Sequence, residues 1–324
     1  MTSIDEAGTG RSGRDAKIAA ALDEQEIVKR HTGQVGWPTV VLAFGLMTAY
    51  ALVIAAWWTG HLALWAGCLL NSALSYAFYT VHHDANHKAI SGRNKKWLWL
   101  DDVFGTIAAI PIQINFKGFS GSHLRHHAHT NDRVRDPDVL VAGPMWQLPI
   151  KWGVGMVFGV VSSLPGGERA AAKLLSRLAP EGLPEPTERQ KADAKRMRRY
   201  GQINLLVLVI SIPLGLFVPA FFLWWLPGRI GVFALMVLFQ WLPHFPHDST
   251  DRFHNTRITT WRGSTFLLLQ QDRHLIHHLY PSVPWYRYRA VFREIRPLLE
   301  AEGADIEGRD STSGRRIELS LASR

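Results

Sequence analysis

The sequence predicts an all-α integral membrane protein, with four spans in two helical hairpins and a cytosolic helical cap. Three observations lead to this fold class. The 324-residue chain is 47% hydrophobic, but its apolar residues concentrate in blocks about as long as a bilayer is thick. Its basic residues almost all fall outside the short turns that join these blocks. All of its 15 histidines except His31 and His61 lie in three windows, 82–87, 123–129 and 244–278.

The first hairpin is predicted near the N-terminus. Residues 39–58 carry no charge, and residues 61–81 follow after the dipeptide Thr59-Gly60. Each stretch is long enough to cross a bilayer as a helix, because a helix rises about 1.5 Å per residue. A connection this short makes the two helices antiparallel neighbours.

A second hairpin is expected from residues 203–225 and 230–243, joined by the Pro-Gly-containing segment 226–229. Two weaker apolar stretches, 97–116 and 146–164, contain charged residues, glycines or prolines. We expect these two stretches to form helices that lie in the membrane interface.

The distribution of charge predicts the orientation. With four crossings, 35 of the 36 lysines and arginines lie on one side of the membrane. Both termini and all three histidine windows are then cytoplasmic, and we expect a bacterial inner membrane. We divide the chain into a cytosolic tail with a lead-in helix (1–38), one membrane domain (39–300) and a disordered tail (301–324).

The number of cysteines and the net charge of the chain exclude several classes of function. The single cysteine, Cys68, excludes a disulfide framework, a cysteine-rich zinc module and an iron–sulfur cluster. Membrane topology already explains the net charge of +9, so no nucleic-acid partner is expected. The basic run Lys191–Arg199 is instead suited to hold a cytosolic helix against anionic lipid.

The histidines repeat one spacing. In each window one histidine is followed by others three or four residues later, a spacing that places them on one face of a helix. The histidines in this pattern are His83, His87, His123, His126, His127, His274, His277 and His278. Eight imidazoles exceed the four ligands that one zinc ion needs. They predict two metal ions with open positions, and iron suits such imidazole-rich sites best.

A ninth ligand is expected between the last span and the histidines at 274–278. His244 is the first candidate, because Gln240 and His244 share a helical face, and His247 is the weaker alternative. Carboxylates near ligand histidines often orient their free N–H groups. The residues that could support the ligands in this way are Asp84, Asp136, Gln240, His247 and Asp248. His82 and His129 fall outside the repeated pattern.

Three other classes fit these residues less well. A zinc protease needs the sequence HExxH, but the residue after His83 is Asp84. A non-enzymatic membrane protein that binds haem or metal would place its histidines inside the spans. A transporter would carry polar residues at mid-membrane, where this chain has little beyond Asn71 and Ser72.

These motifs resemble the three histidine boxes of membrane fatty acid desaturases and hydroxylases. The matching segments are HDANH at 83–87, HLRHH at 123–127 and HLIHH at 274–278, and the resemblance runs from about residue 39 to 300. Finer features are most similar to β-carotene hydroxylases of the desaturase type. These features are HHAHTND at 126–132 with Asp136-Pro137-Asp138, WLPH at 241–244, NTR at 255–257 and HHLYPSVPWYRY at 277–288.

The resemblance implies an O2-dependent oxidoreductase with two Fe2+ ions, acting on C–H bonds of a lipophilic membrane substrate. Hydroxylation of a carotenoid ring is our first expectation. A fatty acid or acyl-lipid desaturase or hydroxylase is the main alternative, and a carotenoid ketolase is a lesser one. The chain has neither a cysteine cluster nor a His-Pro-Gly-Gly haem motif. We therefore expect electrons from separate proteins, such as a ferredoxin and its reductase.

Overall fold

A computed structural model describes residues 23–178 and 185–307. Residues 23–31 are helical. The other helices and strands are α2 (Trp37–Trp58), α3 (Leu64–Asn86), η1 (Lys95–Trp97), α4 (Leu98–Ile112), α5 (Phe116–His129), η2 (Pro137–Val141), η3 (Met145–Gln147), α6 (Leu148–Ser163), α7 (Gly167–Leu178), α8 (Glu188–Ser211), α9 (Phe217–Ala220), η4 (Phe221–Trp225), α10 (Leu226–Leu235), η5 (Met236–Trp241), β1 (Arg257–Thr259), α11 (Ser264–Leu267), η6 (Gln271–Arg273), α12 (His274–Leu279), η7 (Trp285–Arg287), α13 (Tyr288–Ala301) and β2 (Asp305–Glu307).

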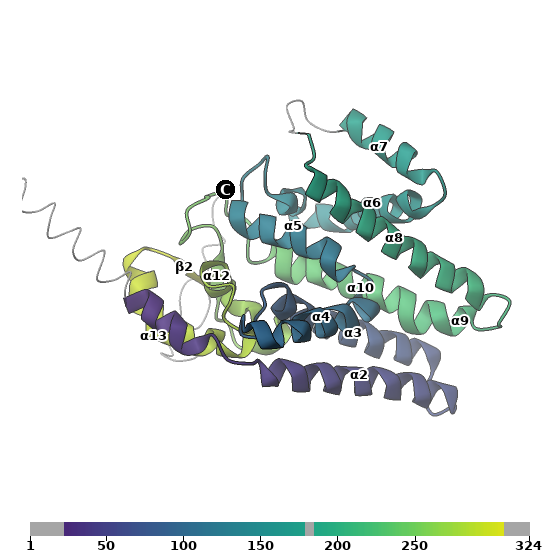
Figure 1. Ribbon diagram of the computed structural model, residues 1–324, viewed down its shortest axis with the longest axis horizontal. Helices are drawn as coiled ribbons and strands as arrows, with labels where there is room; N and C mark the ends of the chain where they lie inside the picture. Colours follow the sequence, from purple (N-terminus) through teal and green to yellow (C-terminus); the bar gives the residue numbers. More distant parts are fainter. Residues whose placement is uncertain (1–22, 179–184, 308–324) are drawn as a thin grey trace, which may run out of the picture.

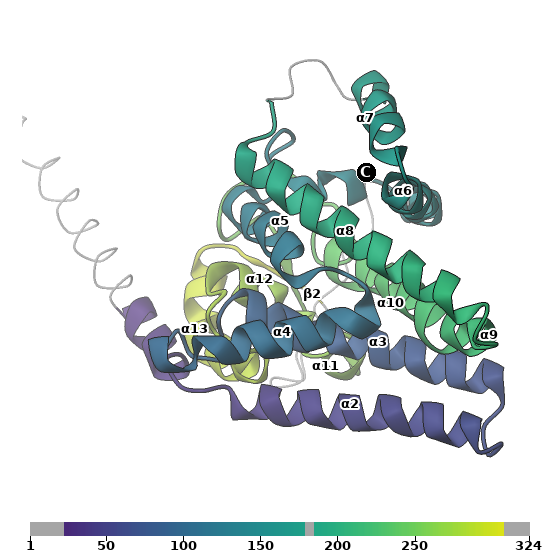
Figure 2. The same ribbon diagram turned by 45° about the vertical axis from the view of Figure 1, so that its right-hand side comes forward.

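The first predicted helical pair is present as α2 and α3, which lie side by side along one edge of the molecule (Figures 1 and 2). Helix α3 runs past residue 81, where we expected the span to end, and its last turn carries His83. The side chains of this last turn are buried. The first histidine window is therefore held rigidly on a packed helix rather than on a loop.

The boundaries that we predicted for the second helical pair are wrong. Helix α8 ends at Ser211, and the chain turns at 212–216, where Gly215 has a φ of +69°. The next helix then continues from Phe217 through Trp241, across the segment 226–229 that we expected to be the turn.

Hydrogen bonds from side chains of other segments explain why the helix continues through this Pro-Gly segment. Pro227 has no N–H, so the carbonyl of Leu223, four residues earlier, lacks its helical partner. The Tyr50 hydroxyl and the Asn71 amide donate to that carbonyl at 2.8 and 2.7 Å. The preceding turn, η4, is a π-helix, an irregularity that disturbs the regular backbone ladder. Gln113 Nε2 donates to two of its carbonyls, those of residues 224 and 225, at 2.8 and 3.1 Å.

The two stretches predicted as interfacial are helical, as α4 and α6. Helix α4 packs along α3, with Phe104, Ala108 and Ile112 buried in the core. Helix α6 contacts α7 and α8 and leaves much of its surface exposed. In the described ranges, α2 and the helix Phe217–Trp241 are long and apolar enough to cross a membrane, by length and composition. The four-crossing topology stays a prediction.

The expectation of an entirely helical fold with a disordered tail from residue 301 needs correction. Residues 305–307 form strand β2, which pairs in parallel with β1, with Ile306 opposite Ile258. An ion pair of 2.6 Å between Arg257 and Glu307 holds the two strands together. Residues 1–22 and 308–324, the remainder of the two predicted tails, lie outside the described residues.

Candidate metal centre

The nine histidines predicted as ligands come together in the structure. They are contributed by the last turn of α3, the second half of α5, the segment after η5, and α12. Their Nε2 atoms converge in two adjacent groups. We define the five-histidine group as His83, His87, His123, His127 and His277. We define the four-histidine group as His126, His244, His274 and His278.

The five-histidine group joins three helices. His277 of α12 lies at its middle, with its Nε2 atom 3.0 Å from that of His83 and 2.8 Å from that of His127. The Nε2 atoms of His87 and His123 are 2.8 Å apart. The ligand atoms of all five residues lie within 4.8 Å of one another. One small ion at their centre would therefore be within reach of every ring.

The four-histidine group repeats this arrangement with a different set of elements. The Nε2 atom of His274 is 3.1 Å from those of both His244 and His278. The ligand atoms of His126, His244 and His278 lie within 4.8 Å of one another. This places His244, rather than His247, among the converging rings. The Nε2 atom of His247 instead lies 3.1 Å from a carboxylate oxygen of Asp305.

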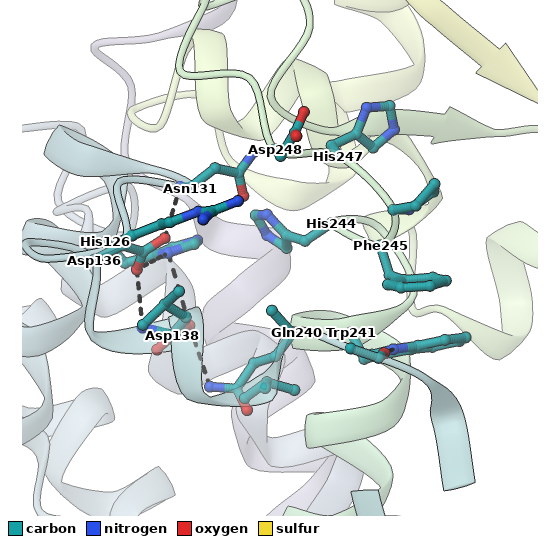
Figure 3. A pocket seen from close by; sticks show the side chains of 16 residues that line it. His126, Asn131, Asp136, Asp138, Gln240, Trp241, His244, Phe245, His247 and Asp248 are labelled. Carbon is teal, nitrogen blue, oxygen red and sulfur yellow. Dashed lines mark hydrogen bonds and ion pairs between the residues drawn. The ribbon is translucent and has the colours of Figure 1, made fainter. Parts of the chain in front are cut away.

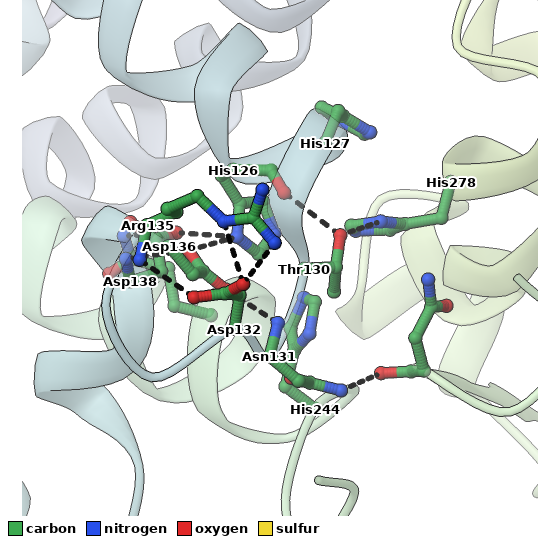
Figure 4. Close-up of polar contacts among 12 residues, drawn as sticks. His126, His127, Thr130, Asn131, Asp132, Arg135, Asp136, Asp138, His244 and His278 are labelled. Atoms are coloured by element: carbon green, nitrogen blue, oxygen red, sulfur yellow. Dashed lines mark hydrogen bonds and ion pairs between the residues drawn. The ribbon is translucent and has the colours of Figure 1, made fainter. Parts of the chain in front are cut away.

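Hydrogen bonds at Nδ1 orient several of the rings (Figure 4). His126 Nδ1 lies 2.8 Å from Asp136, whose carboxylate can only accept, so the proton is on Nδ1. The hydroxyl of Thr130 donates its hydrogen bond to the carbonyl of His126. Because that proton is already used, the same hydroxyl accepts from His278 Nδ1, at 3.2 Å. The Tyr288 hydroxyl lies 3.0 Å from His277 Nδ1. Protons fixed on Nδ1 leave the Nε2 lone pairs free to bind a metal.

Burial sets the charge of the rings. Burial lowers the pKa of His123, His127 and His277 well below the usual range of imidazole, and neighbouring histidines lower it further. These rings are therefore neutral at pH 7, which is the form that binds metals. His126 differs. Burial alone would lower the pKa of its imidazole, but the hydrogen bond that it donates to Asp136 and the charge of Asp138 raise the pKa overall.

The donor set fits two metal ions. Nitrogen ligands about 2.0–2.1 Å from one metal ion lie about 3 Å from each other, which is the spacing of the neighbouring Nε2 atoms in both groups. Two such groups are present, with nitrogen ligands from four segments far apart in the sequence. All-nitrogen sites with more than one open direction suit iron better than magnesium or calcium, which prefer oxygen ligands.

A cavity of about 200 Å³ opens beside the four-histidine group (Figure 3). His126 and His244 line it, together with the carboxylates of Asp136 and Asp138. Asp138 lies 3.8 Å from His126 Nδ1 and accepts a hydrogen bond of 3.2 Å from Gln240. The cavity therefore lies directly against one of the two groups.

The residues predicted to support the ligands differ in what they contact. Asp136 contacts a ring directly, and Gln240 acts through Asp138. Asp248 lines the cavity with His247. Asp84 is buried, but its recorded partners are the Thr39 hydroxyl at 2.8 Å and the Trp285 backbone N–H at 3.3 Å. Asp84 therefore ties α2 and α3 to the segment after α12 and does not orient an imidazole by these contacts.

The two histidines left out of the pattern lie outside both groups. His82 is buried against Phe116 and Phe119, with its Nδ1 atom 3.1 Å from the Asn86 amide. His129 is half-buried at the end of α5. The sequence did not indicate Thr130, Tyr288 or Asp138 as partners of the ligands. Thr130 lies one turn after His126, a signal that could have suggested it, whereas Tyr288 comes from another helix.

The fold and the site define a class: a mostly helical protein with two helices long and apolar enough to cross a membrane, and with a histidine-rich centre suited to two metal ions. Comparison with known proteins then gives the family. The family model described as "Fatty acid desaturase" matches residues 55–307. The chain belongs to the fatty acid desaturase family, whose members are membrane-bound, non-haem di-iron oxidoreductases.

Curated relatives of the chain are plant and cyanobacterial proteins. An omega-6 fatty acid desaturase, chloroplastic, of Brassica napus is 23% identical over 80% of this chain and 59% of its own length. A Delta(9) fatty acid conjugase-like enzyme of Dimorphotheca sinuata is 24% identical over 68% and 65%. An sn-1 acyl-lipid omega-3 desaturase (ferredoxin) of Nostoc sp. is 22% identical over 80% and 73%. The chain thus spans less than two thirds of the length of the first two relatives.

Proposed function

We propose that this protein is an acyl-lipid desaturase that binds one iron ion in each histidine group. The observation that carries the proposal is the convergence of nine imidazole rings into two adjacent groups within a chain of this family. The names of the relatives supply the substrate class, because they act on fatty acids or acyl lipids.

Our first expectation from the sequence, hydroxylation of a carotenoid ring, gains no support from these relatives. The motifs behind it, such as the segment after the third histidine window, lie close to the metal centre in the structure. Trp285 of that segment, for example, donates to Thr39 and Asp84 and so supports the end of α3. The motif therefore has a packing role that does not depend on the substrate.

The protein's own residues hold and isolate the centre. Two bound irons would supply the oxidising power, with O2, to break an unactivated C–H bond, which no side chain can do. The buried imidazoles bind the ions in neutral form, and Asp136, Thr130 and Tyr288 fix the direction of their rings. Tyr79, Phe119 and Phe239 pack together beside the five-histidine group and keep water from that side.

The partners and the membrane topology follow from the same proposal. One relative is named for ferredoxin, which supports a separate ferredoxin-like electron donor. Four crossings with both termini and the metal centre in the cytoplasm agree with the distribution of basic residues. An acidic carrier would then meet a basic surface, which favours rapid association at low salt.

Product analysis tests the proposed activity. The chain is expressed with a ferredoxin and its reductase in a bacterium that makes β-carotene, and acyl chains and pigments from the same cells are analysed by mass spectrometry. We expect acyl chains that have lost two hydrogens and unchanged pigment. His277→Ala should abolish the product, and His31→Ala is the matched control, since His31 pairs with Glu294 and belongs to neither histidine group. Pigment that gains oxygen beside unchanged acyl chains would contradict the proposal.

A further inference from the structure

A large cavity in the described part of the chain lies away from the metal centre. It has a volume of about 760 Å³ and is formed by α6, α7 and α8 together with residues of α10. Figure 2 shows α6 and α7 standing beside α8. No histidine lines this cavity, and none of its lining residues lines the cavity beside the four-histidine group. It requires an explanation separate from catalysis.

One wall of this cavity is apolar and has room for a chain. Gly155 and Gly159 lie one turn apart on α6 and both face the cavity. A Cβ atom at either position would meet no other atom within 4 Å. Met156, Val160 and Leu205 line the same space. Farther along the same two helices, α6 and α8 touch closely, since a Cβ at Gly201 would lie 2.3 Å from the Ser163 hydroxyl oxygen.

The other side of the cavity is cationic. Lys191, Lys195, Arg198 and Arg229 line it, whereas Glu168 is the one acidic residue among its lining residues. Glu168 already pairs with Arg198. Lys191 pairs with Glu188 at 2.9 Å. Lys195 and Arg229 therefore supply the positive charge that the acidic residue lining the cavity does not balance, so the cavity is complementary to an anion.

Arg229 is the most unusual of these cations. It comes from the middle of the long apolar helix Phe217–Trp241. Its Nη2 atom reaches only backbone carbonyls, those of Ile112 and Gln113, at 3.5 and 3.4 Å. Its buried Nε atom has no hydrogen-bond partner within the described residues. A cation in a membrane helix is costly and normally faces a partner or a ligand.

We propose that this cavity binds an anionic phospholipid. The phosphate is held by Lys195 and Arg229, and one acyl chain lies along the glycine face of α6. A cavity of this size is in the range of small-molecule sites, and it combines the apolar wall and the cationic groups that an anionic amphiphile needs. The bound lipid fills the space between α6 and α8 and so fixes the α6–α7 pair on the membrane domain.

Lipid binding to the purified full-length protein tests this proposal. Native mass spectrometry measures the affinity for phosphatidylglycerol and for phosphatidylcholine with identical acyl chains. We expect one phosphatidylglycerol to bind at least about tenfold more tightly than phosphatidylcholine, and to raise the Tm. Equal affinities for the two headgroups would overturn the proposal. Iron content and desaturation are measured in parallel, because their loss would concern the metal centre and leave this site intact.

Matched variants locate the site. Gly159→Leu fills the cavity, and Gly153→Leu is its control, because Gly153 also has open space around it but does not line the cavity. Arg229→Gln and the exposed Lys195→Gln remove cations, and Arg199→Gln on the same helix is their control. We expect Gly159→Leu, Arg229→Gln and Lys195→Gln to weaken phosphatidylglycerol binding at least about fivefold. Equal losses in the two controls, or unchanged binding in all three test variants, would overturn the assignment.

Discussion

The two histidine groups are built from the same ligand type but differ in their surroundings. In the five-histidine group, the rings come from three packed helices. Nδ1 of the central ring, His277, contacts the phenol of Tyr288. In the four-histidine group, His126 is held by the carboxylate of Asp136. That group also lies beside a cavity lined by polar residues.

This difference in surroundings gives the two groups different properties. A buried group with neutral partners keeps its ligands uncharged and shields its ion from water. A carboxylate behind a ligand imidazole makes the ring more basic and stabilises the charge of a bound cation. We infer that the four-histidine group is the more exchangeable of the two, because a cavity lies directly against it.

Removal of the central ligand should have the largest effect. His277→Ala takes away the ring that lies within 3.0 Å of both His83 and His127. We expect iron content to fall from about two to about one per chain, and desaturation to be lost. Metal analysis of the purified variant measures this. Retention of both ions, with activity, would remove His277 from the ligand set.

His244→Ala should disable the other group. Its Nε2 atom lies 3.1 Å from that of His274, so we expect loss of one iron and of activity. His247→Ala is the matched control, because its ring faces Asp305 and lies outside the converging rings. We expect its iron content to match the wild type. If His247→Ala lost iron and His244→Ala kept it, the assignment of the ninth ligand would have to be reversed.

Asp136→Asn should weaken one group selectively. The variant keeps the shape of the side chain but removes the negative charge behind His126. Loss of such a partner typically lowers metal affinity by about 10–100-fold. A chelator titration should therefore release the ion of the four-histidine group earlier and leave the other unchanged. Equal weakening of both ions would show that the groups do not differ as we describe.

Tyr288→Phe should have the smallest effect of the four. It removes one neutral hydrogen bond to His277, which contributes about 1 kcal/mol, or roughly a fivefold change. We expect a slightly faster release of the ion in the five-histidine group, measured in the same chelator titration. An effect larger than that of Asp136→Asn would reverse the ranking of the two supports.

Much of the site could be predicted from the sequence, because its ligands obey a local rule. Spacings of three and four residues place imidazoles on one helical face, and α5 and α12 are helical where the pattern requires it. The division into groups could not be predicted in this way. His126 and His127 are neighbours in one window, yet they belong to different groups. Which ring meets which depends on how α12 lies against α5.

The fold was less predictable where tertiary contacts override a local signal. Pro227-Gly228 has the composition of a turn, but Tyr50, Asn71 and Gln113 supply the hydrogen-bond donors that let the helix continue. Gly228 is also needed there, because a Cβ would lie 2.6 Å from Gln113 Nε2. Strand β2 was missed for a similar reason, since its partner β1 lies far away in the sequence.

Location of the metal ions tests the central claim most directly. Anomalous diffraction at the iron absorption edge, from crystals of the iron-loaded protein, gives their number and position. We expect two peaks, one between the Nε2 atoms of His83, His127 and His277, and one between those of His244, His274 and His278. A single peak, or a peak away from both histidine groups, would contradict the account.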